Sequence, residues 1–596
     1  MSDIFTYIKE QETAYNTTPV PIEDGYEWSM KEHIRKSVLY RDSKFTQGAN
    51  DGTRPYKNII RRIRNFAIVA MNFDVKDIEP FVDNADEYYK SFLTRKFHAK
   101  WARKFGLDTY IDKLVESYED FGLALSKHIK GKAPEAVPLQ SIAFCDQTDI
   151  LSGPICLKHQ YSPAQLKDFE GNWGTAAAGA TTTIDELITL ARNEKTDSTG
   201  NRKTKTPGKF IEVYELDAML PKAWLKKDGE TVTEDDETTY SQQMHIVAFY
   251  KDDNNERKGV TLFKGKGDPN KYKAIKRDDV WGRACGFGGI EELFEPQVWT
   301  NYNMIRIQEM LDAASKMIGV TSDPGVATRN KITEMETGDW IVVKEGATAQ
   351  QFNNQPFNLP VFENAVALWE QHAQGIGSAY DAQLGDSPSS GTPFKLQDAV
   401  IRQGKGLHDE RKRRLSFHLG EIYRDWILQD LVREMSNEQQ FMEELSLEEM
   451  EYVAKAVVDN RTYEMLKEKI LNGEEIFPET EAEYRQIVLN EFMDSGNTKF
   501  FEIVKDELKD LPIDVNINIA GAQKDLGLFT DKLTNVFRMA IANPAIFQIP
   551  GIPKLFNQIL QSSGLDEVNF TKLTAAAPPM PQQAPQQAQQ LQPITT

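Results

Sequence analysis

Residues 281–320 read WGRACGFGGIEELFEPQVWTNYNMIRIQEMLDAASKMIGV, and the rest of the chain is organised around them. Four glycines fall between 282 and 289. Glycine can take positive φ angles and lets other backbone approach closely. A helical pattern follows from about 290 to 318, and Pro296 is tolerated if the regular helix begins near it. The stretch therefore predicts a glycine-rich turn that leads into a long helix.

One narrow arc of this helix is polar. At 100° per residue, the arc contains Gln297, Asn301, Gln308, Asp312 and Ser315. Apolar side chains, including Trp299 and Leu311, cover most of the remaining circumference. A helix that is apolar on nearly every side is buried on nearly every side, so we expect neighbours on both flanks and water along the polar line. The core helix of a large single domain is the alternative, and this helix alone does not separate the two.

Length and composition set broad limits. The chain has 596 residues, of which 40% are hydrophobic, enough for about three to four domains with real cores. No run of eighteen apolar residues occurs, so we expect no membrane span. The first residues lack the basic and apolar regions of a signal peptide. The three cysteines, Cys145, Cys156 and Cys285, are too few for a disulfide framework and fit a reducing cytoplasm.

The net charge of −20 constrains any role with nucleic acid. A protein that grips DNA phosphates carries a basic face, so an acidic chain argues against a sequence-reading DNA binder. An acidic wall repels DNA and avoids sticking to it, so the charge is compatible with a smooth conduit.

The order of the segments predicts an α+β fold that is mainly helical. Residues 1 to about 55 read as an irregular arm, and helical patterns follow. A polar linker at 196–208 precedes β-rich pieces, which we interpret as a small strand-rich insertion between helical segments. After the central helix, residues 375–394 are rich in Gly, Ser, Pro and Asp and predict a mobile loop. A second long helix is predicted at 395–435, followed by acidic amphipathic helices.

Catalytic motifs are missing. Two segments are rich in glycine, GKGDPNK at 265–271 and GFGG at 286–289, and neither has the GxxxxGK[ST] pattern of a phosphate loop. The sequence also contains no HExxH zinc motif and no GxSxG nucleophile elbow. We therefore expect no enzyme activity, no metal site and no cofactor. The basic cluster ERKRR at 410–414 has two interpretations: a positive belt that faces DNA or a neighbouring subunit, and a solvated helix face with local ion pairs.

This order resembles the portal proteins of tailed double-stranded DNA bacteriophages. Residues 280–317 look like the portal segment that leaves the clip, turns on glycines and enters the second stem helix. VYELDAMLPKAWL at 213–225 looks like the first clip strand, and the loop at 375–394 looks like the tunnel loop that feeds the long wing helix. The resemblance covers about residues 55–450 and rests on segment order and local character.

The resemblance implies a portal fold with wing, stem, small β-rich clip and helical crown, assembled as a ring. Its parts would be an N-terminal arm and wing at 1–160, a first stem helix region and linker at 161–208, a clip at 209–288, a second stem helix at 289–319, a wing at 320–450 with tunnel loop 376–394 and long helix 395–435, a helical crown-like region at 451–570 and a disordered Pro/Gln-rich tail at 571–596.

It also implies a function. Portal subunits form a ring, usually dodecameric, at one capsid vertex, and a separate terminase pumps DNA through it before the DNA leaves by the same route. The implied partners are copies of this chain, double-stranded DNA, the terminase large subunit, the major capsid protein and adaptor or tail proteins. The implied location is the virion, with host cytoplasm during assembly. The tunnel loop would offer weak, exchangeable DNA contacts from Ser387, Ser389, Ser390 and Thr392, and the polar arc of the stem would face the channel.

Two other hypotheses remain open. The chain could be another phage structural ring or scaffold component, such as an adaptor or baseplate protein. It could also be a metal-dependent nucleic-acid-processing enzyme with an unrecognised acidic site.

Overall fold

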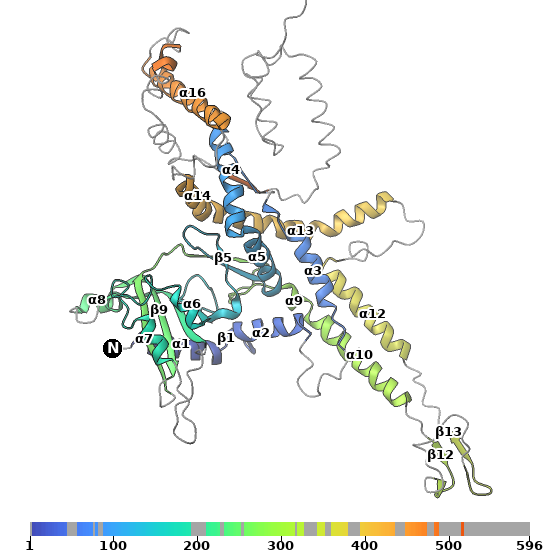
Figure 1. Ribbon diagram of the computed structural model, residues 1–596. Coiled ribbons are helices and arrows are strands. Elements are labelled where there is room, and N and C mark those ends of the chain that lie inside the picture. The colour runs from blue at the N-terminus through green and yellow to red at the C-terminus, as the bar shows by residue number, and fades with distance from the viewer. Residues whose placement is uncertain are drawn as a thin grey trace, which may run out of the picture. The chain divides into compact units, whose positions relative to one another are not determined.

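The protein is described by a computed structural model (Figure 1). It describes residues 3–43, 56–75, 78–81, 88–191, 210–226, 232–251, 256–315, 319–326, 342–351, 359–379, 394–435, 447–473, 482–487 and 514–517. The chain mixes helix and sheet and forms two compact units. Unit 1 contains Met1–Val75 and Trp101–Asp430, and unit 2 contains Lys76–Lys100 and Leu431–Thr596.

A five-stranded antiparallel sheet forms one centre of unit 1. In spatial order its strands are β10 (Arg257–Lys266), β9 (Tyr240–Lys251), β8 (Ile211–Pro221), β7 (Ile155–Tyr161) and β6 (Ile142–Phe144). β8 pairs with β7 in the register Cys156↔Leu216. The strands predicted after the linker are present, but they join strands that precede it, so they belong to a larger sheet. Backbone hydrogen bonds between segments far apart in sequence leave no local signal.

Both faces of this sheet are buried. Successive strand residues point to opposite faces, so Tyr214 and Leu216 pack in one core with the helix α1 (Ile4–Thr17), while Val213 packs in a second core. The second core contains α6 (Pro163–Lys167) and α7 (Ile184–Leu190). Capping boxes at Ser162 and Thr183 begin these two helices.

The N-terminal segment is ordered, contrary to the expected irregular arm. It consists of α1, the hairpin β1 (Val20–Glu23) and β2 (Tyr26–Trp28), and α2 (Met30–Arg41). Ile8 and Ile34 anchor the two helices in the same core as β6 and β7. In each helix these anchors continue a spacing of four residues, with Ile4 before Ile8 and Met30 before Ile34, which places them on one face.

Residues 161–208 also differ from expectation. The described part holds only the short α6 and α7, of five and seven residues, and both pack on the sheet. A long first stem helix is absent from described residues 161–191.

A three-stranded sheet and a set of helices complete unit 1. The sheet order is β11 (Tyr272–Lys276), β4 (Leu123–Lys127) and β5 (Glu135–Ala136). The helices are α3 (Ile60–Met71), α5 (Leu107–Phe121), α9 (Gly289–Glu292), α10 (Phe294–Ser315), α12 (Leu359–Ile376) and α13 (Phe394–Ile422). The long helix predicted at 395–435 is confirmed: α13 continues through a π-helical turn (Tyr423–Ile427) into α14 (Leu428–Met435).

In unit 2, β3 (Ile78–Phe81) pairs antiparallel with β14 (Asp514–Ile517), and α16 (Leu447–Leu471) is the longest described helix. The helix α4 (Tyr88–Phe105) crosses the boundary between the units. Most of the crown-like region and the whole tail at 571–596 lie outside the described residues. Among the helices described, none has the length and apolarity that crossing a membrane requires.

Candidate channel and subunit-contact surface

Helices α10 and α12 lie side by side as an antiparallel pair (Figure 1). Trp299 stacks on Trp369 with ring centroids 6.3 Å apart and an interplanar angle of 9°. Further along the pair, the Arg306 guanidinium lies 6.0 Å from the Phe362 ring. These two contacts fall at the same antiparallel register. Two short paired strands, β12 (Gly319–Thr321) and β13 (Ala349–Gln351), lie between the helices in sequence.

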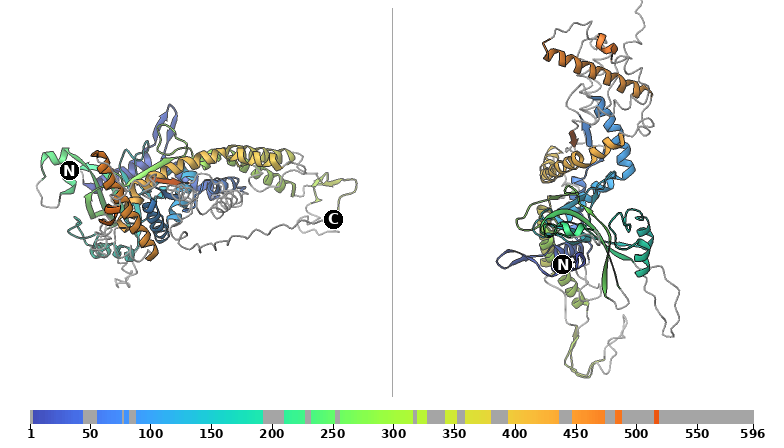
Figure 2. Two further views of the ribbon diagram at one scale, coloured as in Figure 1. Left: turned by 90° about the horizontal axis from the view of Figure 1, so that it is seen from above. Right: turned by 90° about the vertical axis from the view of Figure 1, so that its left-hand side faces the viewer.

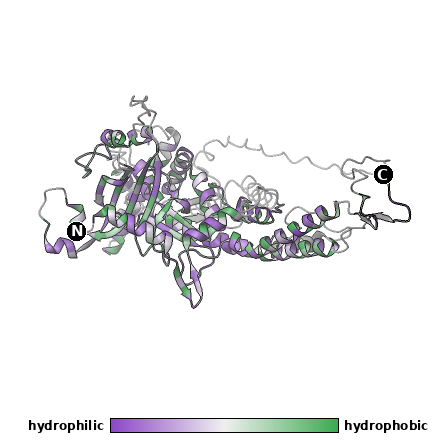
Figure 3. Ribbon diagram, turned by 90° about the horizontal axis from the view of Figure 1, so that it is seen from below, coloured by the Kyte–Doolittle hydropathy of each residue, from purple (hydrophilic) through white to green (hydrophobic). Residues whose placement is uncertain are grey.

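The helix pair exposes large apolar side chains. Trp299 and Leu311 of α10 are 44% and 43% exposed, and Leu368 of α12 is 66% exposed. Figure 3 shows hydrophobic and hydrophilic residues interspersed along these helices. Large apolar side chains exposed on both helices make this pair a candidate contact surface. The apolar pattern of residues 359–376 carries the same signal in the sequence as that of α10.

Two residues of the predicted polar line are buried, which corrects the expectation that they face water. The Gln297 side chain accepts hydrogen bonds from the backbone N–H groups of Ile59 (2.9 Å) and Ile60 (3.4 Å) and donates one to the Lys57 carbonyl (2.8 Å). Asn301 accepts one from the Lys57 N–H at 3.3 Å. Helix α3 begins after Ile59, whose side chain cannot cap it, so Gln297 satisfies free N–H groups at the start of that helix.

The later residues of the predicted polar line, Gln308, Asp312 and Ser315, remain candidates for a surface that faces the channel. Gln308 donates a hydrogen bond to the Asp312 carboxylate at 2.9 Å, and both side chains are exposed. Ser315 is the last residue of α10. Their place on a channel wall stays a prediction.

The predicted tunnel loop falls mostly on residues 380–393, which lie outside the described part together with Ser387, Ser389, Ser390 and Thr392. Its N-terminal flank is tightly packed. A Cβ on Gly377 would lie 2.3 Å from the Cγ2 of Ile63, so glycine is required there, and Ala379 is fully buried. The described residues that precede the loop are therefore held in unit 1.

His408 of α13 lies beneath this flank. Its ring contacts Phe66 at 5.4 Å between centroids, and it is almost fully buried. Burial, and secondarily the charges of Arg411 and Arg277, lower the pKa of His408 to about 4. His408 is therefore neutral at physiological pH.

In the basic cluster at 410–414, some side chains are buried in the protein and others are exposed to solvent. Arg411 is buried and reaches the carboxylates of Asp278 (3.0 Å) and Glu292 (3.5 Å). Arg413 and Arg414 are half-exposed and pair with Glu410 along the helix. The outward pair fits the interpretation of a solvated face with local ion pairs, whereas Arg411 attaches α13 to the segment before α9.

The glycine-rich segment acts by close approach of backbones, as predicted. A Cβ on Gly286 would lie 2.5 Å from the Asp278 carbonyl oxygen, and one on Gly288 would lie 2.7 Å from the Asp120 carbonyl oxygen. The buried Arg277 side chain stabilises the same region through ion pairs with Glu292 at 2.9 Å and Glu119 at 3.1 Å. The glycine-rich segment therefore fixes the position at which the chain enters α9 and α10.

The described residues contain no group of three or more His, Cys, Asp or Glu side chains that could hold a metal ion. The three cysteines are buried free thiols.

Comparisons with known proteins add little. No protein-family model and no curated protein matches the sequence. Among solved structures, the chain is similar to one from the neck of an empty gene transfer agent particle computed with C6 symmetry, at 10% identity and a TM-score of 0.33, with 65% of this chain and 79% of that chain covered. Chains from the native virion and from the native neck computed with C12 symmetry each give 10% identity, a TM-score of 0.30 and coverage of 64% and 85%. Scores this low do not establish a shared fold.

Proposed function

We propose that this chain is the subunit of a portal ring, a passive DNA channel at one capsid vertex through which a separate terminase packages the genome and to which tail or adaptor proteins attach. The observation that carries the proposal is a succession of elements. The helix pair α10 and α12 is followed by the segment 380–393 and then by α13, a helix of 29 residues. Stem, tunnel loop and long wing helix follow one another in this order in the portal layout.

This succession changes the assignment of the parts. We assign α10 and α12 as the two stem helices and residues 316–358 as the clip between them, in place of 209–288. The five-stranded sheet then belongs to the wing, because β8 and β9 are built onto β7 and share its core. The tunnel loop keeps its predicted place at 376–394, of which residues 380–393 lie outside the described part.

The exposed apolar surface of the helix pair supports assembly. Trp299, Leu311 and Leu368 would each be covered by a neighbouring copy. Obligate interfaces bury thousands of Å² and are apolar at the centre, so a closed ring gives these side chains the partners that one chain lacks. The net charge of −20 suits a wall that DNA passes without sticking.

The test is electron microscopy of the purified full chain in negative stain, together with its mass in solution. We expect a cone-shaped particle with a central hole, near twelvefold. A stable monomer, or a closed particle without a hole, would overturn the portal. A ring that binds the tail side of a capsid but lacks a stem would favour the alternative of an adaptor or baseplate component.

The enzyme alternative has its own assay. Without a phosphate loop in the sequence, we expect no ATP hydrolysis by this chain alone. Reproducible metal-dependent cleavage of DNA that is lost on mutation of a single carboxylate would favour a nuclease.

A further inference from the structure

A two-stranded hairpin stands out from unit 1. β1 and β2 pair in the register Val20↔Trp28, and in both views of Figure 2 the dark-blue hairpin projects from the body. Its turn at Gly25 has φ +82°. An isolated two-stranded hairpin is marginally stable in water, so an ordered one needs support at its base or along its length.

The side chains of Gln147 and Trp28 support the base of the hairpin. The buried Gln147 amide accepts a hydrogen bond from the Met30 N–H at 3.0 Å and donates one to the Thr18 carbonyl at 3.0 Å. It thus ties together the two ends of the hairpin. Trp28 is buried below the Arg283 guanidinium, which lies 5.6 Å from its ring. The arm is therefore held in one direction before any partner arrives.

The outer part of the hairpin is acidic and carries an aromatic ring. Glu23, Asp24 and Glu27 are exposed, and none of them has an ion pair or hydrogen bond with another side chain in the described part of the chain. Tyr26 is 45% exposed. The tip thus offers three negative charges around one ring.

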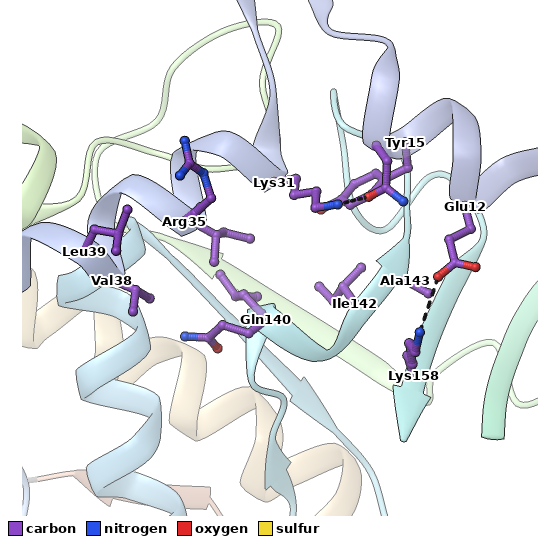
Figure 4. A pocket seen from close by; sticks show the side chains of 13 residues that line it. Glu12, Tyr15, Lys31, Arg35, Val38, Leu39, Gln140, Ile142, Ala143 and Lys158 are labelled. Atoms are coloured by element: carbon purple, nitrogen blue, oxygen red, sulfur yellow. Dashed lines mark hydrogen bonds and ion pairs between the residues drawn. The ribbon is translucent and has the colours of Figure 1, made fainter. Parts of the chain in front are cut away.

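A hollow that has lysine and arginine side chains in its lining lies between α1 and α2. Its volume is about 460 Å³, within the range of roughly 300–1,000 Å³ typical of binding pockets. Figure 4 shows apolar side chains such as Val38 and Ile142 in its wall. The charged side chains that line it are Lys31, Arg35, Lys158 and Glu12. Arg35 pairs with Glu32, and Lys158 pairs with Glu12 and Glu212, whereas Lys31 donates a hydrogen bond to the neutral amide of Asn16. The charge of Lys31 is therefore the one most open to an acidic partner.

The hairpin cannot fill the hollow of its own chain. The hollow lies on the face of α2 that carries Lys31, Ile34 and Val38, whereas His33 on the opposite face points toward Phe121 and Glu291. The hairpin leans toward that second side, where a Cβ on Gly282 would lie 3.3 Å from the Cδ1 of Ile22.

We propose that the β1–β2 hairpin of one copy docks into the α1–α2 hollow of the next copy, with Tyr26 inserted and the acidic tip facing Lys31 and Arg35. The two surfaces differ and lie on different sides of one chain, so the contact is head-to-tail. Such contacts close into rings or continue as filaments. The inference deepens the proposed ring and rests on it only for closure, since the hairpin contact itself also operates in an open oligomer.

Charge reversal tests the pairing. A first variant carries Glu23→Lys, Asp24→Lys and Glu27→Lys, and a second carries Lys31→Glu and Arg35→Glu. Each alone places like charges against each other, and we expect the concentration for half-assembly to rise by about tenfold or more. Mixing the two variants, or combining all five substitutions in one chain, restores opposite charges and is expected to restore assembly.

A control and a second readout keep the test decisive. Glu234→Lys, Asp235→Lys and Glu237→Lys on the exposed helix α8 (Glu234–Thr238) change the net charge equally and should leave assembly unchanged. Copies with Asp24→Cys mixed with copies with Gln140→Cys should form a disulfide-linked dimer on oxidation, and neither should do so alone.

The outcomes separate this inference from the proposed function. Wild-type rings that persist in both reversal variants and give no crosslink overturn the hairpin contact and leave the portal intact. Crosslinked open chains without a hole support the hairpin contact and overturn the portal. A wild-type monomer without crosslinks overturns both.

Discussion

At the start of α3, the amide of Gln297 satisfies N–H groups that the preceding Ile59 side chain leaves free. Gln297→Ala would leave these buried groups without partners, so we expect the free energy of unfolding to fall by about 1–3 kcal/mol. Gln308→Ala, on the same face of α10 but exposed, should change it by no more than about 0.5 kcal/mol. Urea unfolding measures both variants. Equal effects would contradict the capping role.

Substitution of Gly286 and of Gly406 by alanine gives a second prediction, because the two changes should have opposite effects on stability. A Cβ on Gly286 meets the backbone oxygens of Asp278 at 2.5 Å and Gly122 at 2.9 Å, so we expect Gly286→Ala to destabilise the fold by about 1–3 kcal/mol. At Gly406, inside α13, a Cβ meets no atom within 4 Å, and alanine favours helix. Gly406→Ala should therefore stabilise the chain by up to about 1 kcal/mol, as thermal unfolding can show.

The attachment of α13 is a property of the element. Arg411→Met keeps the apolar stem but removes the buried charge that faces Asp278 and Glu292. We expect a loss of about 1–3 kcal/mol in the free energy of unfolding, because charge-assisted contacts to Asp278 and Glu292 are lost, although Glu292 keeps its ion pair with Arg277. Arg413→Met removes an exposed charge on the same helix and should leave the melting temperature unchanged. If both variants melt alike, Arg411 does not hold the helix in place.

The helix pair α10–α12 supplies a different prediction. Leu368 is 66% exposed, so Leu368→Lys should leave the stability of the single chain unchanged while it prevents assembly. Glu363→Lys, at an exposed position on another face of α12, is the matched control. Sedimentation velocity distinguishes assembled from dissociated protein. Normal assembly of the Leu368→Lys variant would show that this surface is not an interface.

At the scale of the whole molecule, buried histidines set the response to acid. Burial is the largest cause that lowers the pKa of His245, His408 and His418 to about 4. In the unfolded chain a histidine has a pKa of about 6.5, so between pH 6.5 and 4 the unfolded state binds more protons. Stability therefore falls as pH falls through this window, by up to about 3 kcal/mol for each histidine.

Urea midpoints between pH 8 and pH 4 measure this effect. The variant His408→Gln with His418→Gln should have a shallower loss of stability between pH 6.5 and 4 than the wild-type chain. An identical slope would show that these two rings do not remain neutral in the folded state.

The sequence by itself determined the elements whose signal is local. Helical periodicity predicted α10 and the long helix that begins at Phe394, and clustered glycines predicted close approach of backbones around Gly286. These features depend on residues a few positions apart, so one stretch of chain contains all the information. The predicted order of stem, loop and long helix follows from the same local signals.

Only the tertiary structure decided which segments pair. The strands at 211–266 extend the sheet that β6 and β7 begin, and the Gln297 side chain points inward to the start of α3. In both cases the partner lies about fifty residues or more away in the sequence, so no local pattern indicates it. A period of 3.6 residues shows that one arc of a helix is polar, but it cannot show whether water or an unsatisfied backbone group lies opposite. That choice belongs to the chain as folded in three dimensions.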